Sequence, residues 1–131
     1  MSYHRNRISS SYTLTAAIGL VLIGMAPAHA EIINVPADYP TIQQAINAAN
    51  AGDEVIVAEG EYVENIDFLG KAITVRSADP EDPDVVEATI ISGDYFDTVV
   101  TCVSGEGQDT VLAGLTITHG DAFWGGGMYN E

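Results

Sequence analysis

Short runs of β-branched and apolar residues, separated by turns that contain Gly, Asp or Pro, recur from residue 54 to residue 118. The runs expected to form strands are 55–58, 62–68, 72–76, 89–91, 98–103 and 111–118. Val55, Ile73 and Ile90 follow one another at intervals close to the length of one solenoid coil. Hairpin dipeptides such as Asn-Gly are absent, and no second helix is expected between the strands. The pattern predicts an all-β solenoid of parallel strands, with a β-sandwich as the alternative.

One segment carries a helical signal, and it follows the first expected strand, Ile32 to Val35. Thr41 and Gln44 form a T-x-x-Q capping box. Apolar residues recur along one helix face at Ile42, Ala45, Ile46 and Ala49. Gly52 is placed to end this helix, which we expect over about 41–51. Such a helix can cover the first edge of the strand array.

Residues 1–30 have the parts of a secretory signal peptide. Arg5 and Arg7 give a basic start, and an apolar stretch runs from Leu14 to Ala26. The tripeptide at 28–30 is the small-residue pattern that a signal peptidase recognises, so we predict cleavage before Glu31 and export to the periplasm, the cell surface or the medium. A membrane anchor is the alternative, but the apolar stretch is shorter than the ~20 residues that span a bilayer. No membrane span is expected in the mature chain.

Beyond the signal peptide, the pattern divides the chain into two parts. Residues 31–53 hold the first strand and the capping helix, and residues 54–131 hold the first coils of the array. The sequence stops within a repeat, at Gly125 to Tyr129. We therefore expect an incomplete array, truncated at its C-terminus.

The predicted mature chain is strongly acidic. All 19 acidic residues lie beyond residue 30, where Lys71 and Arg76 are the two basic residues, so the formal charge there is 2 − 19, or −17. Such a surface repels nucleic acid and anionic lipid, and we expect no nucleic-acid partner. Polyanionic sugars are repelled as well, unless a divalent cation bridges them.

Cys102 is the single cysteine, so no disulfide can form within the chain. Strand alternation places it on the same face as Val100, which predicts a small buried side chain. A reactive thiol is the alternative, but no basic residue is near in sequence to lower the pKa of Cys102.

Several segments resemble right-handed parallel β-helix proteins of the pectin lyase-like group. Residues 39–49 are similar to the opening of those proteins, and 51–57, 60–66 and 71–77 are similar to their first coils. Residues 114–120 and 125–129 resemble the G-L-T-I-T-x-G and G-G-G-x-Y repeats of bacterial surface β-helix proteins. The resemblance spans nearly all of 32–130. It implies a right-handed parallel β-helix, but a scaffold does not fix its site.

Pectin methylesterases share the opening of the chain but differ at the positions that matter for catalysis. Where that family carries a strand with an oxyanion-binding Gln, this chain has Phe123, Trp124 and three glycines. A Gln-Asp-Thr segment occurs at 108–110, before the strand that begins at Gly114 rather than after it. Asp109 is therefore interpreted as a turn residue. We predict no complete catalytic set in this chain.

Asp94 and Asp97 flank Tyr95 and Phe96 in an expected turn. Two carboxylates can act as acid and base on a sugar, or they can ligate Ca²⁺, and Tyr95 can stack on a sugar ring. The favoured interpretation is that both aspartates are solvated turn residues.

His119 is the one histidine that remains after processing, so a zinc site or a catalytic triad has almost no ligands to draw on. A structural role is favoured over that of a base oriented by Asp121. Trp124 and Phe123 lie beside glycines that allow close approach of a ligand, and they are candidates for stacking on carbohydrate. The favoured interpretation is that these two rings cover the neighbouring coil, because aromatic burial is the larger energy term.

These features favour an exported or cell-surface β-helix scaffold that binds polysaccharide or a protein partner. The alternative is part of a polysaccharide lyase or another pectin-active enzyme, with Ca²⁺ as its cofactor. The sequence leaves open whether the protein is an enzyme.

Overall fold

The computed structural model describes residues 29–131. The signal peptide predicted for residues 1–30 lies almost wholly outside the described residues. The strands are β1 (Ile32–Val35), β2 (Glu54–Val57), β3 (Gly60–Val63), β4 (Ile66–Asp67), β5 (Thr74–Ser77), β6 (Thr89–Ser92), β7 (Val100–Cys102), β8 (Val111–Ala113), β9 (Thr116–Thr118) and β10 (Met128–Asn130). The helices are α1 (Ile42–Ala48) and α2 (Pro83–Ala88).

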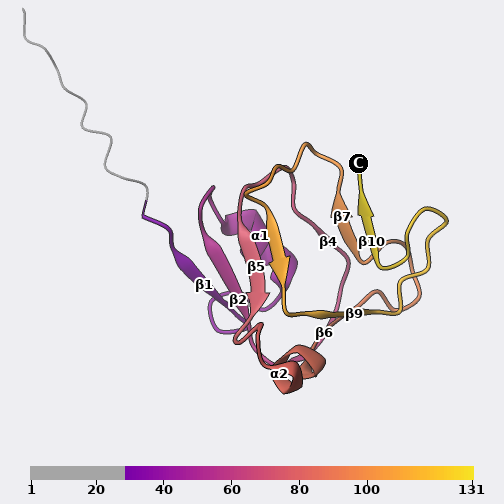
Figure 1. Cartoon of the computed structure of the whole chain (residues 1–131), viewed down its shortest axis with the longest axis horizontal. Helices are drawn as coiled ribbons and strands as arrows, with labels where there is room; N and C mark the ends of the chain where they lie inside the picture. Colours follow the sequence, from indigo (N-terminus) through magenta and orange to yellow (C-terminus); the bar gives the residue numbers. More distant parts are fainter. Residues whose placement is uncertain (1–28) are drawn as a thin grey trace, which may run out of the picture.

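The strands form three separate sheets, with the orders β1-β2-β5-β8, β3-β6-β9 and β4-β7-β10. Every pair of named strands is parallel. Strands that follow one another from β2 onward enter the three sheets in the same cyclic order (Figure 1). The predicted all-β, parallel architecture is confirmed at this level. The β-sandwich alternative is wrong, because sandwich sheets are antiparallel.

The core lies between the sheets and is built from side chains that alternate inward along each strand. In the first sheet, Val55 pairs with Ile33 on one side and with Val75 on the other, so equivalent apolar residues stack through the molecule. The largest fully buried side chains include Phe68, Ile42, Ile46, Ile66, Ile73 and Ile91. Each stabilises the fold by about 1.5–3 kcal/mol through burial.

The interval taken from the sequence does not match the observed register. Val55 pairs with Val75 rather than with Ile73, and Ile90 pairs with Glu61 in a different sheet. The turns between strands differ in length, so equal spacing along the sequence does not mark equivalent positions in space.

Two runs predicted as single strands are each divided. The run 62–68 forms β3 and β4, because the chain leaves one sheet for another at residues 64–65. The run 111–118 divides into β8 and β9 at Gly114, which has a φ of +63°. A β-carbon at Gly114 would lie 2.4 Å from Pro80 Cα, so this crossing requires a glycine.

Helix α1 confirms the predicted N-terminus but is shorter than the predicted 41–51. The Thr41 hydroxyl accepts a hydrogen bond from Gln44 N at 3.2 Å, as an N-cap does. The four predicted stripe residues, Ile42, Ala45, Ile46 and Ala49, are all buried. The helix ends before Ala49, whose backbone is extended, and Gly52 lies in the turn that follows.

Helix α2 lies between β5 and β6, so the expectation of no second helix between the strands is wrong. Asp82 caps it by accepting a hydrogen bond from Asp84 N at 3.0 Å, and Pro83 occupies its first turn. An Asp followed by Pro is a helix-start signal, so the sequence contained the evidence for this helix. Neither helix described between residues 29 and 131 has the length and apolar character to cross a membrane.

Candidate functional site

Two loops that connect the same pair of sheets lie side by side (Figure 1). Loop 93–98 joins β6 to β7, and loop 119–127 joins β9 to β10. Because β6 pairs with β9 and β7 pairs with β10, the strand register brings the second loop next to the first. A backbone hydrogen bond from Tyr95 N to His119 O, at 2.7 Å, joins them. We call residues 93–98 and 119–127 the aromatic loops.

The aromatic loops expose four large aromatic side chains. The exposed fractions are 64% for Tyr95, 73% for Phe96, 91% for Phe123 and 77% for Trp124. Phe123 and Trp124 meet edge to face, with ring centroids 4.9 Å apart. The favoured prediction that these two rings cover the neighbouring coil is therefore wrong for residues 29–131. A single exposed aromatic is ordinary, but four on adjacent loops are typical of an interaction site.

A pair of glycines explains why the second loop projects from the fold. A β-carbon at Gly120 would lie 1.7 Å from Gly126 O, and a β-carbon at Gly126 would lie 2.5 Å from Gly120 O. The two backbone segments thus touch at the neck of the loop, where no side chain fits. Gly126 O also accepts a hydrogen bond from Val99 N at 3.0 Å, which fixes the neck to the residue that follows the first loop. Phe123 and Trp124 lie at the tip beyond this neck.

Asn65, which lies between β3 and β4, holds the first loop in place. Its side-chain amide donates to Phe96 O at 2.9 Å and to Thr98 O at 2.7 Å. Positive φ angles at Asp94, Tyr95 and Asp97, between 50° and 61°, turn the loop tightly. Such angles cost non-glycine residues roughly 1–2 kcal/mol each, so the surrounding contacts must hold the loop in this conformation. Sequence reasoning missed Asn65, because its partners lie about one coil further along the chain.

His119 contacts Ser92 and Tyr95, and its structural role stays a prediction. Its Nδ1 lies 3.2 Å from the hydroxyl of Ser92, and its ring centroid lies 4.6 Å from that of Tyr95. The backbone N–H of Asp121 donates to Asp97 O at 3.1 Å. Ser92 is buried, so this Ser–His pair supports the loop rather than presenting a nucleophile.

Three carboxylates are exposed on the aromatic loops, at Asp94, Asp97 and Asp121. One oxygen of Asp97 accepts a hydrogen bond from Thr98 N at 2.8 Å. Among residues 29–131, no group of three or more His, Cys, Asp or Glu side chains is arranged to hold a metal ion. The role of Asp94 and Asp97 as Ca²⁺ ligands or as an acid–base pair stays a prediction.

The basic side chains are engaged elsewhere. The Lys71 ammonium donates to three carbonyl oxygens at the C-terminal end of α1, those of Ile46, Asn47 and Ala49, at 2.7–2.8 Å. Arg76 forms an ion pair with Glu54 and donates to two backbone carbonyls. These are the two Lys and Arg residues beyond residue 30, so neither serves the aromatic loops.

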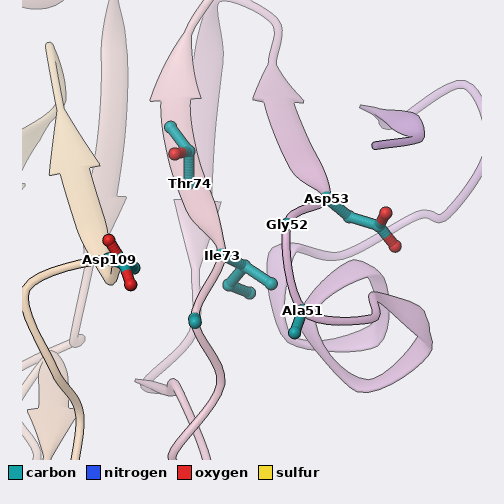
Figure 2. Close-up of a pocket in the computed structure, with 7 residues that line it drawn as sticks. Ala51, Gly52, Asp53, Ile73, Thr74 and Asp109 are labelled. Carbon is teal, nitrogen blue, oxygen red and sulfur yellow. The ribbon is translucent and has the colours of Figure 1, made fainter. Parts of the chain in front are cut away.

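A shallow hollow of about 450 Å³ lies where β2, β5 and β8 begin (Figure 2). Its lining residues are Ala51, Gly52, Asp53, Ala72, Ile73, Thr74 and Asp109. The Asp53 carboxylate is directed away from the hollow and accepts hydrogen bonds from Glu31 N and Asn50 N, which lower its pKa. Asp109 lies in a turn, as predicted. The hollow therefore offers one free carboxylate and one hydroxyl, and no paired catalytic groups.

Cys102 is buried beside the core, as its alternation with Val100 predicted. Burial raises the pKa of the Cys102 thiol, and the nearby charges of Glu106 and Asp67 raise it further. A raised thiol pKa favours the unreactive protonated form, so the reactive-thiol alternative loses its support.

Comparisons with protein-family models, with curated proteins and with solved structures gave no match for this chain.

Proposed function

We propose that this protein is an exported, cell-surface β-helix scaffold that binds polysaccharide through the aromatic loops. The observation that carries the proposal is the set of four exposed aromatic rings on two adjacent, hydrogen-bonded loops. Aromatic rings present a flat apolar surface of the kind that packs against the C–H face of a sugar. Exposed carboxylates in the same loops supply acceptors for sugar hydroxyl groups.

The scaffold that we propose is a right-handed parallel β-helix of the pectin lyase-like type, with the three sheets as its faces. The cyclic order of the strands supports it, since each round from β2 to β4, β5 to β7 and β8 to β10 adds one strand to every sheet. The parallel pairing between successive rounds supports it as well. Helix α1 contacts β1, β2 and β4, as a cap over the first round would.

Export is proposed from the signal peptide predicted at residues 1–30. Mass spectrometry of the exported protein is expected to give a mature chain that begins at Glu31. An exported protein that still begins at Met1 would contradict cleavage, and a protein retained in the cytoplasm would contradict the proposed location.

Polysaccharide is favoured over a protein partner by the surroundings of the rings. The centre of a protein interface is depleted of charged residues. Here Asp94 and Asp97 flank Tyr95 and Phe96 directly, and Asp121 lies two residues before Phe123. Rings interspersed with carboxylates suit a hydroxyl-rich ligand better than an apolar protein surface.

The test uses intrinsic fluorescence, because Trp124 is the single tryptophan of the chain. The exported protein is titrated with a panel of soluble polysaccharides, and a bound sugar is expected to shift the Trp124 emission. Trp124→Ala, followed by affinity electrophoresis, is expected to weaken binding by about tenfold, since an aromatic contact is worth about 0.5–1.5 kcal/mol beyond the area that it buries. Its melting temperature should be unchanged because the ring is exposed.

Ile32→Ala is the matched control, since Ile32 is an exposed apolar residue on β1, outside the aromatic loops. Binding that Trp124→Ala and Ile32→Ala reduce equally would contradict the proposal. Release of unsaturated sugar products in the presence of Ca²⁺ would favour the lyase alternative.

A further inference from the structure

We propose that the aromatic loops select a polysaccharide that carries free amino groups, such as a polymer of non-acetylated hexosamine. This inference rests on the proposed function and names the class of its ligand. Four exposed rings and three exposed carboxylates occupy the same two loops, and the basic residues of the mature chain are held elsewhere.

The order of residues in each loop places a carboxylate beside the rings. In the first loop Asp94 and Asp97 enclose Tyr95 and Phe96, and in the second Asp121 precedes the ring pair at the tip. The hydrogen bond from Asp121 N to Asp97 O holds the two acidic positions together at 3.1 Å between backbone atoms. Exposed rings and exposed carboxylates therefore lie on the same two adjacent loops.

A protonated amine is a group that both the aromatic rings and the carboxylates can bind. An ammonium ion is attracted to the face of Trp or Tyr and forms charge-assisted hydrogen bonds with carboxylates. A repeating polymer presents many ammonium groups, so it can engage the first loop and the second loop at once. The formal charge of −17 on the predicted mature chain also draws a polycation toward the surface.

The same features disfavour uronic acid polymers and sulfated polymers. Lys71 is held by three carbonyl oxygens of α1, and Arg76 is held by Glu54 and two carbonyls. An anionic sugar at the aromatic loops would meet Asp94, Asp97 and Asp121 without a compensating cation. A bridging Ca²⁺ would need a cluster of oxygen ligands, and residues 29–131 hold no group of three carboxylates arranged for one.

The experiment titrates the exported protein with one hexosamine polymer prepared at several degrees of N-acetylation. A neutral glucan and a polyuronate, with and without Ca²⁺, complete the panel, and Trp124 emission is the signal. Full N-acetylation is expected to lower the affinity by about tenfold. Raised salt is expected to weaken binding of the non-acetylated polymer, because it screens the ammonium groups. Neither the neutral glucan nor the polyuronate should bind as tightly as the amine polymer.

Substitutions separate a local site from attraction by overall charge. Asp94→Asn and Asp121→Asn each remove one exposed carboxylate from the aromatic loops, whereas Asp109→Asn removes one from the turn before β8. All three change the net charge equally. We expect each loop variant to weaken binding of the amine polymer severalfold, and Asp109→Asn to leave it nearly unchanged.

Equal affinity for the amine polymer and its fully acetylated form, or for the neutral glucan, would overturn the selectivity and leave polysaccharide binding intact. Ca²⁺-dependent binding of polyuronate that exceeds binding of the amine polymer would overturn it too. Equal losses in all three Asn variants would assign the attraction to net charge and refute the local site. Failure to bind any polymer of the panel would refute the proposed function itself.

Discussion

Glu64 is predicted to be one of the most important single side chains for the stability of this fold. It follows β3 and reaches the N-terminal end of α1, where its two carboxylate oxygens accept hydrogen bonds from Ile42 N and Gln43 N, both at 2.9 Å. The first turn of α1 contains no acidic residue of its own. Glu64 therefore supplies both the hydrogen-bond acceptors and the negative charge that the start of a helix requires.

The expected cost of Glu64→Ala follows from those contacts. A hydrogen bond to a charged group contributes about 1.5–3 kcal/mol, and a charge at a helix terminus contributes about 0.3–1 kcal/mol. Water can reach this half-buried position and replace part of the loss. We therefore expect the free energy of unfolding to fall by about 2–3 kcal/mol, which lowers the Tm of a domain of this size by roughly 10–20 °C.

Urea unfolding followed by circular dichroism measures the change, and Glu61→Ala is its control. Glu61 lies on β3 and is exposed, so its substitution removes the same charge three residues earlier in the chain. We expect a change of no more than about 0.5 kcal/mol for Glu61→Ala. Glu64→Gln retains one acceptor oxygen and should be intermediate. If Glu64→Ala and Glu61→Ala have the same unfolding free energy, the capping argument is refuted.

Three further predictions concern pH, the loop neck and the thiol. The backbone amides of Glu31 and Asn50 lower the pKa of Asp53. The stabilisation by its carboxylate is therefore present above about pH 4 and is lost as the pH falls through the lowered pKa. Asp53→Asn should reduce the fall of the unfolding free energy at acid pH, and an unchanged fall would contradict this prediction. Gly126→Ala should disrupt the second aromatic loop and alter Trp124 emission, whereas Gly107→Ala, which meets open space, should not. Cys102 should react with a thiol reagent only after unfolding, and fast reaction of the native protein would disprove its burial.

Local signals in the sequence were sufficient for part of the fold. The capping box and apolar stripe located α1, since both depend on residues within two turns of one another. Alternation identified the strands except β10, which no expected run contains, and Cys102 was correctly placed inside. The end of α1 could not be found this way, because the side chain that binds its last carbonyls, Lys71, comes from beyond the next three strands.

Positions where the chain passes from one sheet to the next were also hidden from the sequence. The β-rich character continues across residues 64–65 and across Gly114, so each run reads as one strand. The division depends on contacts made in space, as between Gly114 and Pro80. The aromatic residues were found individually, but their placement on adjacent loops depends on the pairing of β6 with β9, which no local pattern encodes.

The use of the basic residues connects stability to ligand selectivity. Lys71 satisfies three carbonyl oxygens that the end of α1 would otherwise leave unpaired. Drawing its ammonium toward an anionic ligand would expose those carbonyls without a donor, at about 1–3 kcal/mol for each one that stays buried. Arg76 is held in a similar way by Glu54 and two backbone carbonyls. Both basic side chains beyond residue 30 are thus engaged within the fold, and the acidic side chains of the aromatic loops have no cation beside them. The sign of the ligand's charge should therefore decide whether it binds.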